Sequence, residues 1–195
     1  KKKLSNGCPP IFYCAGDFQY EGGNSWGCPD EILFKYVEKY IAEEKDERTF
    51  HIILTTSNHP PYNIDVASKG FPKEEIKQKL PDSLGSDEET LNEMGHIWYV
   101  DQSMGNFIEK VEADKPDTLF VITGDHAERF DFAQEVDLKT LSAVPCIFYG
   151  KNVDKDLLAD NKVGCHLQII STLAEMAGKK GDTYSSIWPS LFEYN

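Results

Sequence analysis

The stretch Leu-Phe-Val-Ile-Thr-Gly-Asp-His at residues 119–126 decides the predicted fold and site. Its first four residues are apolar, which indicates a buried strand, and a glycine turn ends that strand. Ligands gather at the carboxyl ends of strands in open α/β sheets, and divalent transition metals take carboxylate and imidazole ligands. Asp125 and His126 are therefore candidates for metal binding. The plainer alternative is an acid that caps the next segment beside a hydrogen-bonded histidine.

The composition excludes several classes of protein. The chain has 195 residues, enough for one domain, and 40% of them are hydrophobic, enough for a core. Its net charge is -13 and its 20 basic residues are scattered. We expect no nucleic-acid partner, because phosphate binding needs a basic face. No run approaches the roughly 18 apolar residues of a membrane span, so we expect the segment itself to be soluble.

Helical and strand-like patterns alternate along the chain. Helices are expected from Pro29–Asp30 to the charged run 43–48, over about 88–112 and over 165–177. Strands are expected over 11–14, 50–54, 119–122 and 144–149. The polar residues 63–87 indicate a long surface excursion. The alternation predicts an α/β fold with a mostly parallel (mixed) sheet flanked by helices.

Two further residues are candidates for a site. His59 lies on the loop after the strand predicted over 50–54, and the two prolines that follow it stiffen the loop. Such a histidine can donate a hydrogen bond to an anionic oxygen, or it can be a turn residue without a ligand. Asp101 falls inside an apolar helical stripe, where a buried acid needs a partner. A hydrogen bond from the helix to a loop is favoured over metal binding for Asp101. The stripe consists of Leu91, Met94, Trp98, Met104, Ile108 and Val111.

Six segments follow one another in an order that a known family shares. They are Trp26-Gly27-Cys28-Pro29-Asp30-Glu31-Ile32-Leu33-Phe34, Thr55-Thr56-Ser57-Asn58-His59-Pro60-Pro61-Tyr62, Tyr99-Val100-Asp101-Gln102-Ser103-Met104, Thr123-Gly124-Asp125-His126, Val144-Pro145, and Ser171-Thr172-Leu173 through Ala177-Gly178. As an ordered set they resemble the sulfatase-like branch of the alkaline phosphatase superfamily, most closely its lipoteichoic-acid synthase (phosphoglycerol transferase) type. Gln168 and Ser171 depart from the family pattern, which has an acid and a proline there.

The resemblance implies a metal-dependent enzyme that acts on phosphate or sulfate esters. It implies that Asp125 and His126 are ligands of a divalent metal, Mn²⁺ first, with Zn²⁺ or Mg²⁺ as alternatives. It implies that His59 binds the substrate phosphate and that Asp101 has a structural part. Arg129 is not a family ligand, but it follows Gly-Asp-His closely enough to steady an anionic substrate.

The resemblance also implies that residues 1–195 are a single partial domain, the carboxyl-terminal half of a catalytic domain. In the family, the preceding half supplies an acidic metal ligand and a threonine nucleophile, and membrane helices come before it. Cys8-Pro9-Pro10 does not replace that nucleophile, because the arginine of the sulfatase signature is absent. We expect no catalytic residue and no turnover in this segment. We expect the full-length protein to be anchored in the cell membrane, with an extracytoplasmic catalytic domain that acts on lipid- or glycan-linked phosphate or sulfate esters at the cell envelope.

Two other functions remain open. One is a true sulfatase or a phosphoethanolamine transferase on the same fold, which the nucleophile upstream would distinguish. The other is a non-catalytic envelope domain that binds a glycan. Gln168 and Ser171 favour this second alternative, whereas the intact Gly-Asp-His and Asn-His-Pro argue against it.

Overall fold

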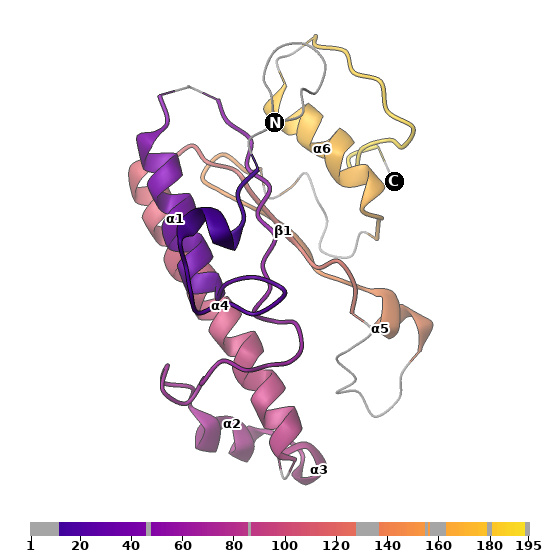
Figure 1. Cartoon of the computed structure of the whole chain (residues 1–195). Coiled ribbons are helices and arrows are strands. Elements are labelled where there is room, and N and C mark those ends of the chain that lie inside the picture. The colour runs from indigo at the N-terminus through magenta and orange to yellow at the C-terminus, as the bar shows by residue number, and fades with distance from the viewer. Residues whose placement is uncertain are drawn as a thin grey trace. The chain divides into compact units, whose positions relative to one another are not determined.

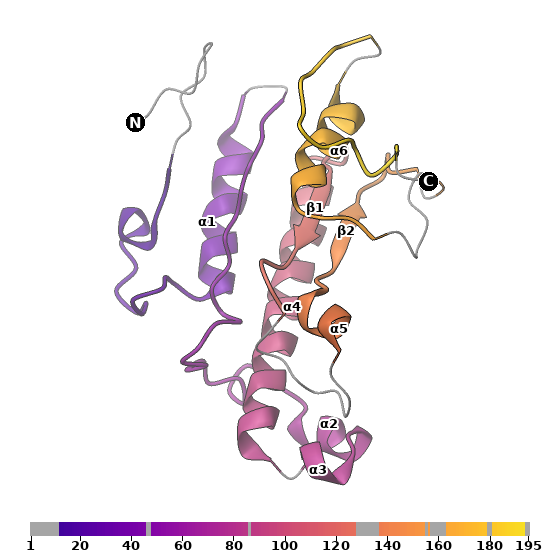
Figure 2. The same cartoon turned by 90° about the vertical axis from the view of Figure 1, so that its right-hand side faces the viewer.

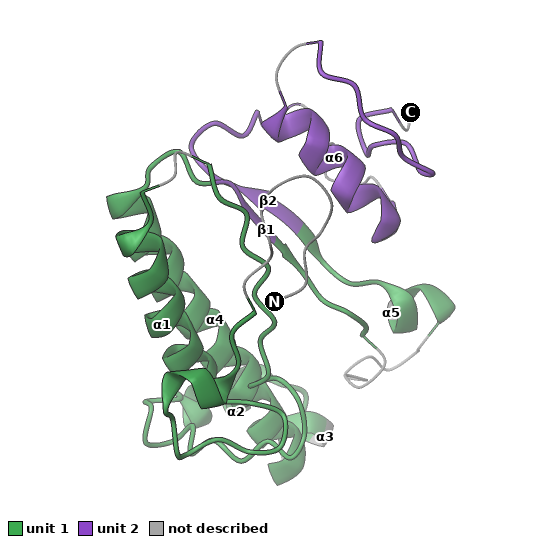
Figure 3. Ribbon diagram, turned by 45° about the horizontal axis from the view of Figure 1, so that its top comes forward, with its two compact units in different colours: residues 1–118, 122–146 green, residues 119–121, 147–195 purple. Residues whose placement is uncertain are grey.

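The computed structural model of the chain describes residues 12–45, 48–85, 87–127, 137–154, 156, 163–178 and 181–193. The elements follow in the order η1 (Ala15–Phe18, a 3₁₀ helix), α1 (Asp30–Glu43), α2 (Lys73–Lys79), α3 (Asp82–Gly85), α4 (Glu88–Asp114), β1 (Phe120–Thr123), α5 (Leu138–Ser142), β2 (Cys146–Tyr149) and α6 (Leu167–Ala177) (Figure 1). Two compact units divide the chain: unit 1 comprises residues 1–118 and 122–146, and unit 2 comprises residues 119–121 and 147–195 (Figure 3).

Unit 1 is built on two helices that lie side by side, α1 and α4 (Figures 1 and 2). The Phe34 ring of α1 stacks on the Phe107 ring of α4, with 4.7 Å between the ring centroids. Burying one such side chain stabilises a fold by about 1.5–3 kcal/mol, so this contact is a major link between the helices. The predicted starts of both helices are confirmed, and Asp87 caps α4 by accepting a hydrogen bond from the Thr90 N–H at 2.8 Å.

The buried face of α4 differs from the predicted stripe. Buried residues recur at every fourth position, namely Leu91, Gly95, Tyr99, Ser103, Phe107 and Val111. The large side chains Met94 and Trp98 are only partly buried beside this face, and Asp101 is exposed. The predicted position of Asp101 within a buried stripe is therefore wrong. The reason is that small residues allow the close contacts: a Cβ added to Gly95 would lie 2.6 Å from Val66.

Residues 63–87 are more ordered than a surface excursion. They contain α2 and α3, and Val66 and Phe71 are buried in a cluster with Tyr99 of α4. His96 of α4 is completely buried behind this segment. Its Nε2 accepts from the Ile64 N–H at 3.1 Å, and its Nδ1 donates to the Asn92 carbonyl oxygen at 2.8 Å. The Ile64 N–H can only donate and the Asn92 carbonyl oxygen can only accept. The ring is therefore the neutral tautomer with its proton on Nδ1.

The sheet is smaller than predicted. β1 and β2 form one two-stranded antiparallel sheet, and the chain leaves β1 toward α5 and returns through β2 (Figure 3). The predicted parallel sheet is absent from the described part of the chain, which is mostly helical. Residues 50–54, a predicted strand, pair with no described strand, and Phe50, Ile52 and Leu54 are 68%, 83% and 79% exposed. A run of β-favouring residues indicates an extended chain, but such a chain becomes a strand only beside a partner.

In unit 2, the tail after residue 184 is tied to α6. The Thr172 hydroxyl donates to the Gln168 carbonyl oxygen and accepts from the Leu191 N–H, and the Ser171 hydroxyl donates to the Pro189 carbonyl oxygen. The predicted helix is confirmed, two residues shorter at its start, and Gly178 caps it as expected. Among the described helices, none combines the length and apolar character needed to cross a membrane.

The buried imidazole of unit 1 generates a prediction about stability. We expect His96→Leu to lower the free energy of unfolding by about 1–3 kcal/mol, because the Ile64 N–H loses its acceptor inside the fold. Burial lowers the pKa of His96 below the ordinary 6.5. A lowered folded-state pKa contributes stability above pH 6.5 that is lost as the pH falls through the folded-state pKa. Urea unfolding followed by circular dichroism at several pH values measures both effects.

The control for this prediction is His51→Gln. His51 is exposed and, among the described residues, pairs with Glu44 alone, across 3.1 Å, so its loss should leave the acid-induced decrease in stability unchanged. If His96→Leu kept the full pH dependence of the wild type between pH 7 and about pH 5, the buried neutral tautomer would be the wrong description.

Candidate functional site

A completely buried carboxylate joins three segments of unit 1. Asp30 is the first residue of α1, and its Oδ1 accepts from the N–H groups of Thr56 at 3.0 Å and Ser57 at 3.1 Å. The Ser57 hydroxyl accepts from the Asp30 N–H at 2.8 Å, and the buried Tyr99 hydroxyl accepts from the Glu31 N–H at 3.4 Å. Two N–H groups that a helix start leaves unpaired thus find partners in residues 56–57 and in α4.

The electrostatics of this cluster follow from its burial. Burial raises the pKa of Asp30, and the hydrogen bonds from Thr56 and Ser57 oppose that rise. Asp30 Oδ2 is buried without a hydrogen-bond partner among the described residues. Burial also raises the pKa of Tyr99 to about 12, so its hydroxyl stays protonated at neutral pH. The hydrogen bonds of the cluster therefore support the loop at residues 56–57.

His59 stands on the loop that this cluster supports. Its Nδ1 donates to the Pro60 carbonyl oxygen at 2.7 Å, and its ring lies against the Trp26 ring, with 4.1 Å between centroids. A carbonyl oxygen only accepts, so Nδ1 carries the proton and Nε2 remains available to a ligand. A neutral Nε2 accepts a hydrogen bond, whereas a protonated Nε2 donates one and suits an anionic oxygen.

A cavity of about 40 Å³ opens beside His59. Its walls are glycine backbone, amide and hydroxyl side chains, and small apolar groups; the lining residues are Gly22, Gly23, Asn24, Gly27, Cys28, Pro29, Thr56, Ser57, His59, Asn63 and Ile64. Burial raises the pKa of the Cys28 thiol, which argues against Cys28 as a nucleophile. His59 is the one residue of a basic type among those that line the cavity.

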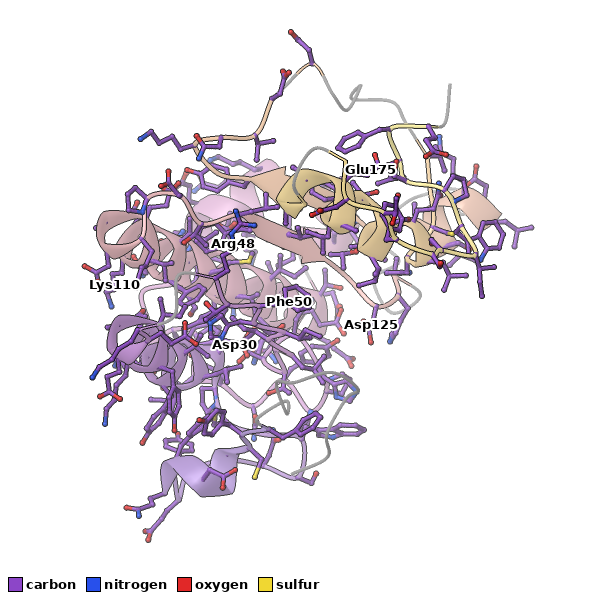
Figure 4. The ribbon with its side chains drawn as sticks, turned by 90° about the horizontal axis from the view of Figure 1, so that it is seen from above. Asp30, Arg48, Phe50, Lys110, Asp125 and Glu175 are labelled. Carbon is purple, nitrogen blue, oxygen red and sulfur yellow. The ribbon has the colours of Figure 1, made fainter. Side chains whose placement is uncertain are left out.

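Asp125 and His126 are adjacent and exposed. They follow β1, and Asp125 Oδ1 accepts from the His126 N–H at 2.9 Å. His126 Nε2 lies 3.7 Å from Asp125 Oδ2, and the Asp125 side chain is 83% exposed. Figure 4 shows Asp125 on the loop after β1 and Asp30 among the side chains of unit 1. The Asp125 and His126 donor atoms therefore lie close together on one exposed loop.

The donor pair fits part of a metal site. One cation can reach an oxygen and a nitrogen that are 3.7 Å apart through bonds of about 2.0–2.2 Å. Within the described ranges, no group of three or more His, Cys, Asp or Glu side chains could hold a metal. Asp125 and His126 could therefore supply two ligands, and a complete site needs at least one more from elsewhere. Arg129 lies outside the described residues.

The predicted site residues fall at two places. Neither Asp125 nor His126 is among the residues that line the cavity beside His59. From the sequence, Asp30 is predicted only as a helix start, and the role of its buried side chain is not predicted. The signal that could have identified it is an acid at the first helical position combined with a Thr-Ser loop that needs acceptors for its N–H groups.

The Asp30 cluster makes a testable prediction. Asp30→Ala should lower the free energy of unfolding by about 2–4 kcal/mol, because the N–H groups of Thr56 and Ser57 lose their acceptor. Asp30→Asn keeps an oxygen in place and should stay within about 1 kcal/mol of the wild type.

The stability that Asp30 contributes should also depend on pH. Because the folded-state pKa of Asp30 is raised, this stability is fully present below pH 3.8 and is lost as the pH rises through the folded-state pKa. The asparagine variant should therefore gain stability relative to the wild type as the pH rises, and a fixed difference from pH 4 to pH 8 would contradict this.

Comparison with known proteins places the chain in a family. The sulfatase family model matches residues 4–179, which is most of the chain. No curated protein and no solved structure matches it. The matched range includes the Asp30 cluster, His59 and the Asp125–His126 pair. The chain belongs to the sulfatase family.

Proposed function

We propose that this chain is part of a metal-dependent enzyme that cleaves or transfers phosphate or sulfate esters, of the lipoteichoic-acid synthase (phosphoglycerol transferase) type. The observation that carries the proposal is the Asp125–His126 pair, with donor atoms 3.7 Å apart directly after β1. Membership of the sulfatase family supports an ester substrate and a divalent metal. The ordered motifs favour the phosphoglycerol transferase type, with a substrate linked to a lipid or a glycan.

Each residue has a proposed part. Asp125 and His126 hold the ion, for which mixed oxygen and nitrogen ligands suit Mn²⁺, with Zn²⁺ or Mg²⁺ as alternatives. When bound, such an ion supplies positive charge that stabilises a phosphoryl or sulfuryl oxygen and activates a nucleophile. His59 donates from Nε2 to a non-bridging oxygen of the ester, and Arg129 steadies its charge. No side chain of this segment is proposed as the nucleophile.

We propose further that the segment is the carboxyl-terminal half of a catalytic domain in a membrane-anchored, extracytoplasmic protein. The threonine nucleophile and an acidic metal ligand would come from the preceding half. The isolated segment then binds metal weakly and does not turn over substrate. A threonine nucleophile upstream would favour the transferase, whereas a Cys or Ser followed by the sulfatase signature would favour a true sulfatase.

A non-catalytic glycan-binding domain receives little support. The departures at Gln168 and Ser171 were its main argument. Gln168 Oε1 accepts from the Cys165 N–H at 3.0 Å, and the Ser171 hydroxyl donates to the Pro189 carbonyl oxygen at 3.2 Å. Both residues are buried: the Gln168 bond holds the chain at the start of α6, and the Ser171 bond ties α6 to the tail. Packing accounts for the two residues without a loss of chemistry.

Metal titration tests the proposal. With two ligands, we expect the chain to bind Mn²⁺ with a Kd on the order of 1 mM by calorimetry, and Asp125→Asn or His126→Ala to remove that binding. Asp101→Asn, which changes an exposed acid on α4, is the matched control and should leave the heat unchanged. A heat that survives both site variants would contradict the metal assignment.

Turnover gives the second readout of the same experiment. Mn²⁺ with bis(p-nitrophenyl) phosphate should yield no nitrophenolate, because no nucleophile is present. A clear rate that Asp125→Asn abolishes would show that the nucleophile lies within residues 1–195.

A further inference from the structure

We infer that Asp30 is a positioning residue for His59: its buried carboxylate fixes where the free Nε2 of the imidazole lies. The inference rests on the proposed role of His59 in binding an anion. Asp30 does not line the cavity beside His59, so it acts through the loop and not on a ligand.

The His59 ring is held from two sides. Its Nδ1 bonds the Pro60 carbonyl oxygen at 2.7 Å, and the Trp26 ring contacts it at an interplanar angle of 41°. Trp26 stays exposed by 59%, yet its backbone is fixed because the Asn24 side chain accepts from the Trp26 N–H at 2.8 Å. The direction of Nε2 therefore depends on how residues 24–30 lie against residues 56–59.

Asp30 joins these two segments. Its Oδ1 receives the N–H groups of Thr56 and Ser57, and the Ser57 hydroxyl receives the Asp30 N–H. The Thr56 carbonyl oxygen accepts in turn from the His59 N–H at 3.1 Å. Fixing the position of Thr56 therefore also fixes the backbone of His59, three residues further on. The approach is close: a Cβ added to Gly27 would lie 3.2 Å from the Thr56 hydroxyl.

A side-chain oxygen at position 30 suits this joint, because it accepts from the N–H groups of both Thr56 and Ser57. Two N–H groups converge on one oxygen, and an ionised acceptor forms shorter and stronger bonds than a neutral one. The position at the first turn of α1 adds favourable interaction with the helix dipole. Burial works against the charge, as the raised pKa shows. Asp30 has no exposed surface and accepts from two backbone N–H groups of the loop, which is a holding role.

The position of His59 has its own spectroscopic signature. The Trp26 ring current shifts the imidazole C–H signals of His59, and aromatic ¹H–¹³C spectra of the whole chain record that shift without any ligand. Trp26→Leu defines the values with no ring current. In Asp30→Ala, the His59 signals should move toward those values while the signals of α4 stay in place. Asp101→Ala is the control and should leave His59 unchanged.

Titration with inorganic phosphate gives the functional readout. Asp30→Ala should weaken phosphate binding at His59 by about threefold to tenfold, the equivalent of one lost hydrogen bond, and Asp30→Asn should restore most of it. If Asp30→Ala does not fold, Ser57→Ala, which removes one bond of the joint, should move the His59 signals in the same direction. Unchanged His59 signals in the folded variants would overturn the inference. Signals that move in a protein that binds no phosphate would leave the positioning intact and contradict the proposed function instead.

Discussion

Asp30 has no exposed surface, and yet its carboxylate lies where α1, residues 56–57 and α4 come together. Leaving a buried N–H without an acceptor costs about 1–3 kcal/mol, and this one side chain satisfies two such groups. The same contacts place the first turn of α1 against the loop of His59. Because native stability is only about 5–15 kcal/mol, a single polar cluster of this kind can decide the local structure.

The cluster also explains why distant motifs occur together. Trp26–Phe34, Thr55–Tyr62 and the segment beginning at Tyr99 are separate in the sequence, and each supplies a group to the cluster or to the His59 ring. Asp30 needs the N–H groups of the second motif, and the start of α1 needs the hydroxyl of Tyr99. The three motifs therefore occur together because their residues form hydrogen bonds and ring contacts around one loop, the loop of His59.

Local features of the fold could be predicted from the sequence. Helical periodicity identified α1, α4 and α6, and apolar runs identified β1 and β2. The parallel sheet could not be predicted correctly, because pairing depends on neighbours and not on the propensity of residues 50–54. The exposure of Asp101 was missed for a similar reason: the buried face of α4 includes the small residues Gly95 and Ser103, which carry no hydrophobic signal and shift the face away from the predicted stripe.

The residue types of the candidate site could be predicted from the sequence, but their positions relative to one another could not. The Asp-His dipeptide after a strand indicated donors for a cation, and the structure places those donors 3.7 Å apart. Nothing in the pattern showed that His59 would line a cavity to which Asp125 and His126 do not contribute. Distances between segments arise from packing, and a single sequence without its contacts does not contain them. The role of Asp30 was not predicted because it depends on a separate loop, where the N–H groups of Thr56 and Ser57 need an acceptor.

Charge sets the final constraint on the proposed chemistry. The chain carries a net charge of -13, and its substrate is proposed to be an anionic ester. Repulsion between distant surface charges fades beyond about 8 Å at physiological salt, so the groups that touch the ester decide its binding. Asp125 alone would repel it. In the proposed site, a cation held by Asp125 and His126 would reverse the local sign. Ester and cation should therefore strengthen each other's binding by the same factor, since such coupling is reciprocal.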